Sequence, residues 1–213
     1  MAARITHRPE DSSGWLELFA NGLAFDLTGL APAAGSRVPL ARHHFGTSPD
    51  IDGFALEAIT LAPGPHLEGG GAMIPVVRTI AGLAANLALP LPVKAVCWHL
   101  TASWMDPDYF VRIVVNWLSG GAFPALGLTA VEQTGDAGVE SVGLSFFIGQ
   151  EVRVEAVPEE TSAETVKLAV RVIDYLVKEG PLNALHELKG PSGEPLLAEP
   201  SSDGRRVRVW RGT

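Results

Sequence analysis

AVCWHLTASWMDPDYFVRIVVNWL, residues 95–118, joins a strand-like segment to an amphipathic helix. Apolar and polar side chains alternate through residues 94–104, and this alternation predicts a central strand with two faces of different polarity. Asp106 then supplies an N-cap, and Pro107 a first helical residue whose φ is already set. Apolar residues recur at helical spacing after them until a Gly-Gly pair ends the helix. A strand followed by such a helix is typical of a layered domain.

The same kinds of pattern predict elements on either side of this stretch. Residues 15–27 alternate around an Asn-Gly pair, which accepts the positive φ angles of a type I′ turn and therefore predicts a β-hairpin. The apolar run over residues 72–89 predicts a buried helix with Pro75 in its first turn. A third helix begins with a capping box formed by Thr161 and Glu164. Its apolar stripe is expected at Val166, Ala169, Val170, Ile173, Leu176 and Val177.

Strands complete the predicted fold. They are expected at residues 54–61, 125–131, 142–148 and 151–157, with an edge strand at 206–210. The order is β-hairpin, then β-α-β-α-β-β-β-α, then a terminal β-strand. We predict an α+β fold in which about three helices pack on a mixed, mainly antiparallel sheet. One domain is expected to cover residues 1–213, with residues 1–14 as a flexible N-terminal segment.

Composition and charge restrict the class of protein. The 213 residues are 46% hydrophobic and 19% charged, which is enough to bury a sizeable core. A formal net charge of −8 favours solubility and disfavours binding to nucleic acid or to an anionic membrane surface, because both would repel the chain. The single cysteine, Cys97, cannot form an internal disulfide and fits a reducing cytoplasm. Neither a secretory signal nor a membrane span is expected, so the predicted location is cytoplasmic.

Two places in the sequence are candidates for ligand binding. The glycine-rich loop before the apolar helix could present free N–H groups to an anion, although a tight turn into a buried helix is the reading that we favour. The polar face of the strand at residues 94–104 could line a small polar pocket. The candidate ligand-binding residues are His66, Glu68, Gly69, Gly70, Gly71, His99 and Ser103.

Other patterns that resemble sites are better explained as structure. Cys97 and His99 lie two residues apart on the predicted strand, about 6.5–7 Å along the chain, which is too far for a thiol–imidazole hydrogen bond. The sequence GLSFF lacks the final glycine of a nucleophile elbow. Adjacent His43 and His44 could join His66 or a nearby aspartate at a metal, but we favour a solvated loop over residues 31–52. We therefore expect no metal and no cofactor.

Arginines concentrate at the C-terminus beside a tryptophan, at Arg205, Arg206, Arg208, Arg211 and Trp210. Such a group could suit an acidic partner or a nucleic-acid backbone. Charged residues also keep exposed edge strands from pairing with one another, and the acidic remainder of the chain favours this second interpretation.

Four segments together resemble a known family. They are the apolar helix before AVCWH, the helix start PDYF, the strand pair GLSFFIGQEVRVEA and the closing helix VKLAVRVIDYLVKEG. Over roughly residues 54–180 this pattern resembles domain-of-unknown-function family 4261 of bacterial proteins. The resemblance implies a bacterial protein and brings no activity, catalytic residue or cofactor with it.

The sequence favours a binding role. We expect a protein without chemistry of its own that binds a protein partner or a small ligand, because no acid–base or metal constellation accompanies the well-patterned core. One alternative is an enzyme whose site is built around His66, Glu68 and His99. Another is a structural homo-oligomer, such as a homodimer, that pairs through a sheet edge or through an apolar patch near Trp104 or Trp210.

Overall fold

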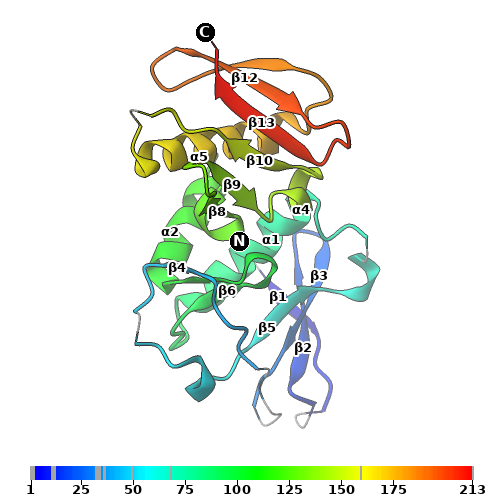
Figure 1. Ribbon diagram of the computed structural model, residues 1–213. Helices are drawn as coiled ribbons and strands as arrows, with labels where there is room; N and C mark the ends of the chain where they lie inside the picture. The colour runs from blue at the N-terminus through cyan, green and yellow to red at the C-terminus, as the bar shows by residue number, and fades with distance from the viewer. Residues whose placement is uncertain are drawn as a thin grey trace. The chain divides into compact units, whose positions relative to one another are not determined.

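The computed structural model describes residues 3–10, 13–31, 35, 37–48, 50–67, 69–158 and 160–212. The fold is α+β, as the sequence predicts, with three sheets that are mostly antiparallel (Figure 1). The chain divides into two compact units, Met1–Gly121 (unit 1) and Ala122–Thr213 (unit 2), and each is described by itself. The expectation of a single domain stays a prediction. In the described part of the chain, no helix is long and apolar enough to cross a membrane.

Unit 1 contains two sheets and two long helices. The four-stranded antiparallel sheet has the order β1 (Arg4–His7), β2 (Trp15–Ala20), β3 (Leu23–Thr28), β5 (Thr60–Pro63). The three-stranded sheet has the order β4 (His43–Phe45), β7 (Ser103–Met105), β6 (Val96–Trp98). The helices are α1 (Ile74–Ala88) and α2 (Pro107–Leu118), and 3-10 turns cover Gly53–Ala55, Pro65–Leu67 and His99–Thr101.

The hairpin of β2 and β3 and both long helices of unit 1 form as predicted. Asn21 and Gly22 have φ angles of 51° and 81°, as a type I′ turn requires. Pro75 lies in the first turn of α1, and the Asp106 side chain caps α2 by accepting a hydrogen bond of 3.0 Å from the Tyr109 N–H. α1 packs on one face of the hairpin. The buried cluster between them contains Ala20, Phe25, Val76, Ile80 and Leu83.

The single strand predicted over residues 94–104 is wrong. The chain forms β6, turns through the 3-10 helix His99–Thr101 and returns as β7, so that Cys97 pairs with Trp104 in an antiparallel register. Ala102 has a φ of 48°, a left-handed conformation that lets the chain reverse there. Apolar and polar residues alternate on both sides of this tight turn, so the pattern resembles one longer strand.

Two shorter strands in unit 1 also differ from expectation. The strand predicted over residues 54–61 is shorter, because Gly53–Ala55 form a 3-10 turn capped by the Asp52 side chain, and β5 begins only at Thr60. The loop predicted over residues 31–52 contains β4, which pairs in parallel with β7. β1 lies within the N-terminal segment that was expected to be flexible.

Unit 2 is a six-stranded sheet with one long helix. The sheet has the order β11 (His186–Lys189), β12 (Pro195–Pro200), β13 (Arg206–Arg211), β10 (Glu151–Val154), β9 (Val139–Val142), β8 (Ala130–Gln133). α5 (Ser162–Glu179) packs against β9 and β10. Two four-residue turns complete the unit, α3 (Ala125–Leu128), which has non-helical backbone angles inside, and α4 (Ser145–Ile148).

Several strand predictions for unit 2 are wrong. β13 is not an edge strand, because it lies between β12 and β10 and pairs in parallel with β10 (Figure 1). The strands predicted at residues 125–131 and 142–148 are replaced in part by α3 and α4; Gly127 within α3 has a φ of 148°, and Gly143 just before α4 has a φ of 84°. β11 and β12 were missed because β11 has a single apolar residue and the apolar residues of β12 are consecutive, so neither strand shows a clear alternation.

α5 has the predicted capping box, in which the Thr161 side chain and the Glu164 side chain each bond the other residue's backbone N–H. The predicted apolar stripe is only partly buried. Ala169, Ile173 and Leu176 are buried, whereas Val166, Val170 and Val177 are half-buried. The buried face also includes Thr165, Leu168 and Val172, so it lies to one side of the predicted stripe.

Candidate functional site

The glycine-rich loop connects β5 to α1 through a series of tight turns. The Gly64 N–H donates to the Ala24 carbonyl at 3.0 Å, the Gly70 N–H to the Leu67 carbonyl at 2.9 Å, and the Met73 N–H to the Gly70 carbonyl at 3.0 Å. Gly69 has a φ of 83°, which favours glycine. These contacts support the reading of the loop as a turn into a buried helix.

The same loop borders an open hollow of about 430 Å³. Its lining residues are Pro63, Gly64, Pro65, Leu67, Gly69 and Gly71. His66 is exposed beside it, and Glu68 lies outside the described residues. A ligand role for His66 and for the glycines stays a prediction, because no charged side chain lines the hollow among the residues that the structure describes.

The structure does not bring His99 and Ser103 together on a polar strand face. His99 is exposed in the 3-10 turn, whereas Ser103 is fully buried in β7. The Ser103 and Thr101 hydroxyls form a hydrogen bond of 2.7 Å with each other, which accounts for two buried polar groups. In the described part of the chain, no hydrogen bond joins His66, His99 or Ser103 to another of the three.

His43 and His44 do not form a metal site in the residues that the structure describes. Both lie in β4, where successive side chains point to opposite faces of the sheet. The His44 Nδ1 atom lies 3.0 Å from the Thr47 hydroxyl, and its ring contacts the edge of Trp104. Across the described ranges, no group of three His, Cys, Asp or Glu residues is placed to hold a metal ion.

Cys97 is half-buried in β6, and loss of solvation raises the pKa of its thiol from 9.0 to about 11. Only the thiolate is a good nucleophile. We expect native Cys97 to react with iodoacetamide at pH 8 about 100-fold more slowly than the same thiol in the unfolded chain, since a pKa two units higher leaves about 100-fold less thiolate. Alkylation rates with and without guanidinium chloride test this. Equal rates in the two states would contradict it.

The same shift predicts how stability depends on pH. The unfolded chain loses the Cys97 proton near its ordinary pKa of 9.0, whereas the folded chain keeps it to about pH 11. The unfolded state therefore binds fewer protons in this range, and the contribution of Cys97 to the free energy of unfolding falls as the pH rises from 9 to 11. Below pH 9 the thiol is protonated in both states, so the contribution of Cys97 to the free energy of unfolding is fully present there.

The outer face of the four-stranded sheet, on the side away from α1, carries a group of side chains that the sequence analysis did not single out. Because successive residues of a strand point to opposite faces, β2 turns Leu16, Leu18 and Ala20 to the face toward α1 and presents Trp15, Glu17 and Phe19 on the other face. We call this outer group the acidic–aromatic face. It consists of Trp15, Glu17 and Phe19 from β2 and Asp26 from β3.

Two carboxylates are direct cross-strand neighbours on this face. Glu17 pairs with Asp26 in the β2–β3 register, which places their Cβ atoms about 4.5–5.5 Å apart. The Thr6 hydroxyl donates to Glu17 Oε1 at 2.6 Å. Within the described residues, no hydrogen bond or ion pair reaches the Asp26 carboxylate. Like charges directly opposite each other destabilise a sheet, so this pair is not explained by stability.

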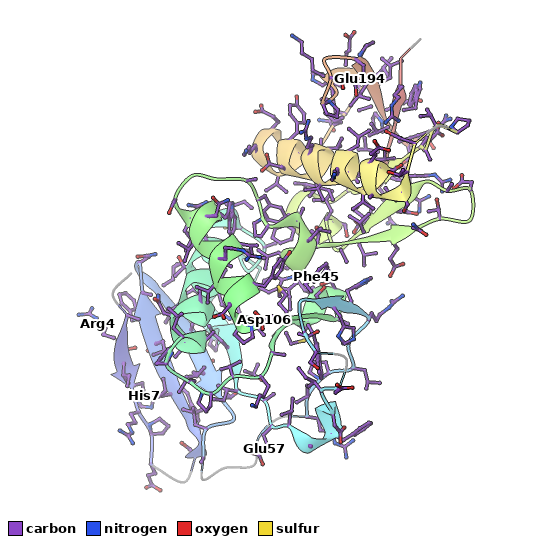
Figure 2. The ribbon with its side chains drawn as sticks, turned by 90° about the vertical axis from the view of Figure 1, so that its left-hand side faces the viewer. Arg4, His7, Phe45, Glu57, Asp106 and Glu194 are labelled. Atoms are coloured by element: carbon purple, nitrogen blue, oxygen red, sulfur yellow. The ribbon has the colours of Figure 1, made fainter. Side chains whose placement is uncertain are left out.

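Aromatic rings lie on both sides of the carboxylates. Trp15 and Phe19 are two residues from Glu17 in either direction, about 6.5–7 Å along the strand. The Arg4 guanidinium lies over the Phe19 ring, 5.2 Å from its centroid, and the His7 ring lies 5.4 Å from that of Trp15. Figure 2 shows Arg4 and His7 projecting from the edge of this sheet. The face can therefore hold a cation by charge and by ring contact together.

The exposed face of the unit 2 sheet offers a useful contrast. Its arginines are matched by carboxylates, since Arg206 pairs with Glu140 at 2.7 Å and Arg208 with Glu155 at 2.5 Å. Arg153 pairs with an aspartate and Arg211 with a glutamate. Arg206, Arg208 and Arg211 of the C-terminal group are thus each paired with a carboxylate, whereas Glu17 and Asp26 form no ion pair within the described residues.

Comparisons with protein-family models, with curated proteins and with solved structures found no match to this chain.

Proposed function

We propose that this is a non-catalytic binding protein whose acidic–aromatic face docks an extended, basic segment of a partner protein. The observation that carries the proposal is the Glu17–Asp26 pair, two adjacent carboxylates that form no ion pair within the described residues and have an aromatic side chain on either side of Glu17. A guanidinium or ammonium group from a partner would pair with the carboxylates and lie against a ring. Arg4 supports this arrangement, because the chain itself already holds a guanidinium over Phe19.

Several features favour binding of an extended segment. The side chains lie on a sheet face, and a partner strand that alternates basic and neutral residues has the same repeat of about 6.5–7 Å as β2. The net charge of −8 would attract a basic partner to the chain and would repel nucleic acid. As part of the same proposal, the protein is cytoplasmic, consistent with its single free cysteine, and related to the bacterial family 4261.

A peptide titration tests the proposed function. The probe is an acetylated and amidated TRTRTR peptide, followed by calorimetry at low salt, with TETETE as the negative probe. We expect the double variant Glu17→Gln/Asp26→Asn to bind TRTRTR about 5–10-fold more weakly than the wild type, because each carboxylate contributes up to about 1 kcal/mol. The matched control neutralises two exposed carboxylates of unit 2, Glu187→Gln/Glu199→Gln, and should bind like the wild type. Equal weakening in both variants, or no binding by the wild type, would overturn the proposal.

Asp26→Asn should also change stability, in the opposite direction to binding. Removing one of two opposed negative charges is expected to raise the free energy of unfolding by about 0.2–1 kcal/mol, since no partner of Asp26 is lost in the described residues. Urea unfolding of the variant, compared with Asp26→Glu, which keeps the charge, measures the difference. A destabilised Asp26→Asn protein would instead assign a structural role to this carboxylate.

A further inference from the structure

We infer that the groove between α1 and α2 is the contact surface of a homodimer, in which a second copy of this chain docks through the same groove. The α1–α2 groove is a hollow of about 190 Å³ with mainly apolar walls. Its lining residues are Gly82, Ala85, Asn86, Leu89, Val111, Val115, Leu118 and Ser119. Small residues of α1 lie in the groove opposite larger apolar residues of α2, which leaves space for a side chain from outside.

Large apolar side chains stand exposed around this hollow. Two of the residues that line it are strongly exposed, Leu89 at 65% just after α1 and Val115 at 51% on α2. Single exposed apolar residues are ordinary, but two that line one apolar hollow form a patch of the kind that marks an interaction surface.

Charge favours a second copy as the occupant. α1 carries one charge, Arg78, whose guanidinium donates to the Trp117 and Leu118 carbonyls at 3.2 and 2.9 Å and so is held at the end of α2. α2 carries only Asp108 and Arg112, which are opposite in sign and one helical turn apart. Two copies with a net charge of −8 repel each other, and this near-neutral surface is where that repulsion is weakest.

The α1–α2 groove offers both a protruding side chain and a recess. A two-fold axis places the same patch on both sides of a contact. A group that protrudes from the patch of one copy must therefore meet a recess in the patch of the other copy. The patch provides both, since the exposed Leu89 borders the hollow formed by Gly82 and Ala85. Leu89 of each copy would then enter the hollow of the other.

Sedimentation velocity of the full chain between about 5 and 200 µM tests the inference. We expect wild-type protein to dimerise and the Leu89→Glu/Val115→Glu variant to stay monomeric, with a dissociation constant raised at least 10-fold. The control, Leu40→Glu/Leu185→Glu, changes two leucines that are 76% and 58% exposed and adds the same charge, and it should dimerise like the wild type. A monomeric wild type, or equal loss of dimer in both variants, would overturn the inference.

Salt and the peptide probe separate this contact from the proposed function. Added salt screens the repulsion between two acidic copies and should strengthen the dimer, whereas it should weaken binding of TRTRTR. The monomeric Leu89→Glu/Val115→Glu variant should bind TRTRTR as the wild type does, because the acidic–aromatic face lies on the side of the sheet away from α1. A dimer that weakens as salt is added would contradict the assigned uncharged contact.

Discussion

The Phe25→Ala variant is expected to lose about 3–5 kcal/mol of the free energy of unfolding, the largest effect predicted for unit 1. Phe25 has no exposed surface and lies in the cluster that joins the four-stranded sheet to α1. Alanine would leave a cavity between the sheet and the helix, because the side chains packed around the site relax only partly into the space. Urea unfolding followed by circular dichroism measures the loss.

Phe54→Ala is the matched control for this prediction. Its side chain is 92% exposed, so the same change in chemistry should alter stability by less than about 0.5 kcal/mol. Phe25 and Asp26 are adjacent on β3 and point to opposite faces, so packing on the inner face supports the acidic–aromatic face. We therefore expect Phe25→Ala to weaken TRTRTR binding only under conditions in which the variant is partly unfolded. Equal stability of the two alanine variants would contradict the assignment of the core.

Local signals were enough to predict the hairpin and the three long helices. Each has a residue whose chemistry fixes its boundary, such as Asn21 in the turn, Asp106 at the start of α2 and Thr161 at the start of α5. The hairpin prediction also contained the Glu17–Asp26 pair, since a two-residue turn at Asn21-Gly22 makes these two residues opposite. The pair was missed because two opposed carboxylates on the polar face of a hairpin follow the same alternation as any other polar residues and have no motif of their own.

Features that depend on distant segments could not be predicted in the same way. The pairing of β13 with β10 joins residues more than fifty positions apart, and nothing local to RVRVW distinguishes an edge strand from an interior one. The reversal between β6 and β7 depends on the left-handed conformation of Ala102, which an alanine rarely adopts. The candidate residues His99 and Ser103 were grouped on a strand that this reversal divides.

The side chain of Glu151 lies in an environment that the sequence pattern does not predict. The alternation of β10 predicts a solvated carboxylate, but Glu151 is half-buried and accepts four hydrogen bonds. The donors are the Ser141 hydroxyl at 2.5 Å and the backbone N–H groups of Gly143 at 3.0 Å, Leu144 at 3.2 Å and Ser145 at 3.0 Å. The carboxylate thereby satisfies the free N–H groups at the start of α4 and ties that turn to the sheet.

Glu151→Ala is therefore expected to lower the free energy of unfolding by about 2–4 kcal/mol, because it leaves several backbone donors without their charged acceptor. Glu155→Ala is the matched control four residues along the chain. It removes one ion pair, with an arginine whose side chain is 56% exposed, and should cost less than about 1 kcal/mol. Urea unfolding of the two variants measures both losses, and hydrogen exchange at Gly143, Leu144 and Ser145 should accelerate only in Glu151→Ala. If the two variants were equally stable, the hydrogen bonds to Glu151 would contribute no more than a surface ion pair.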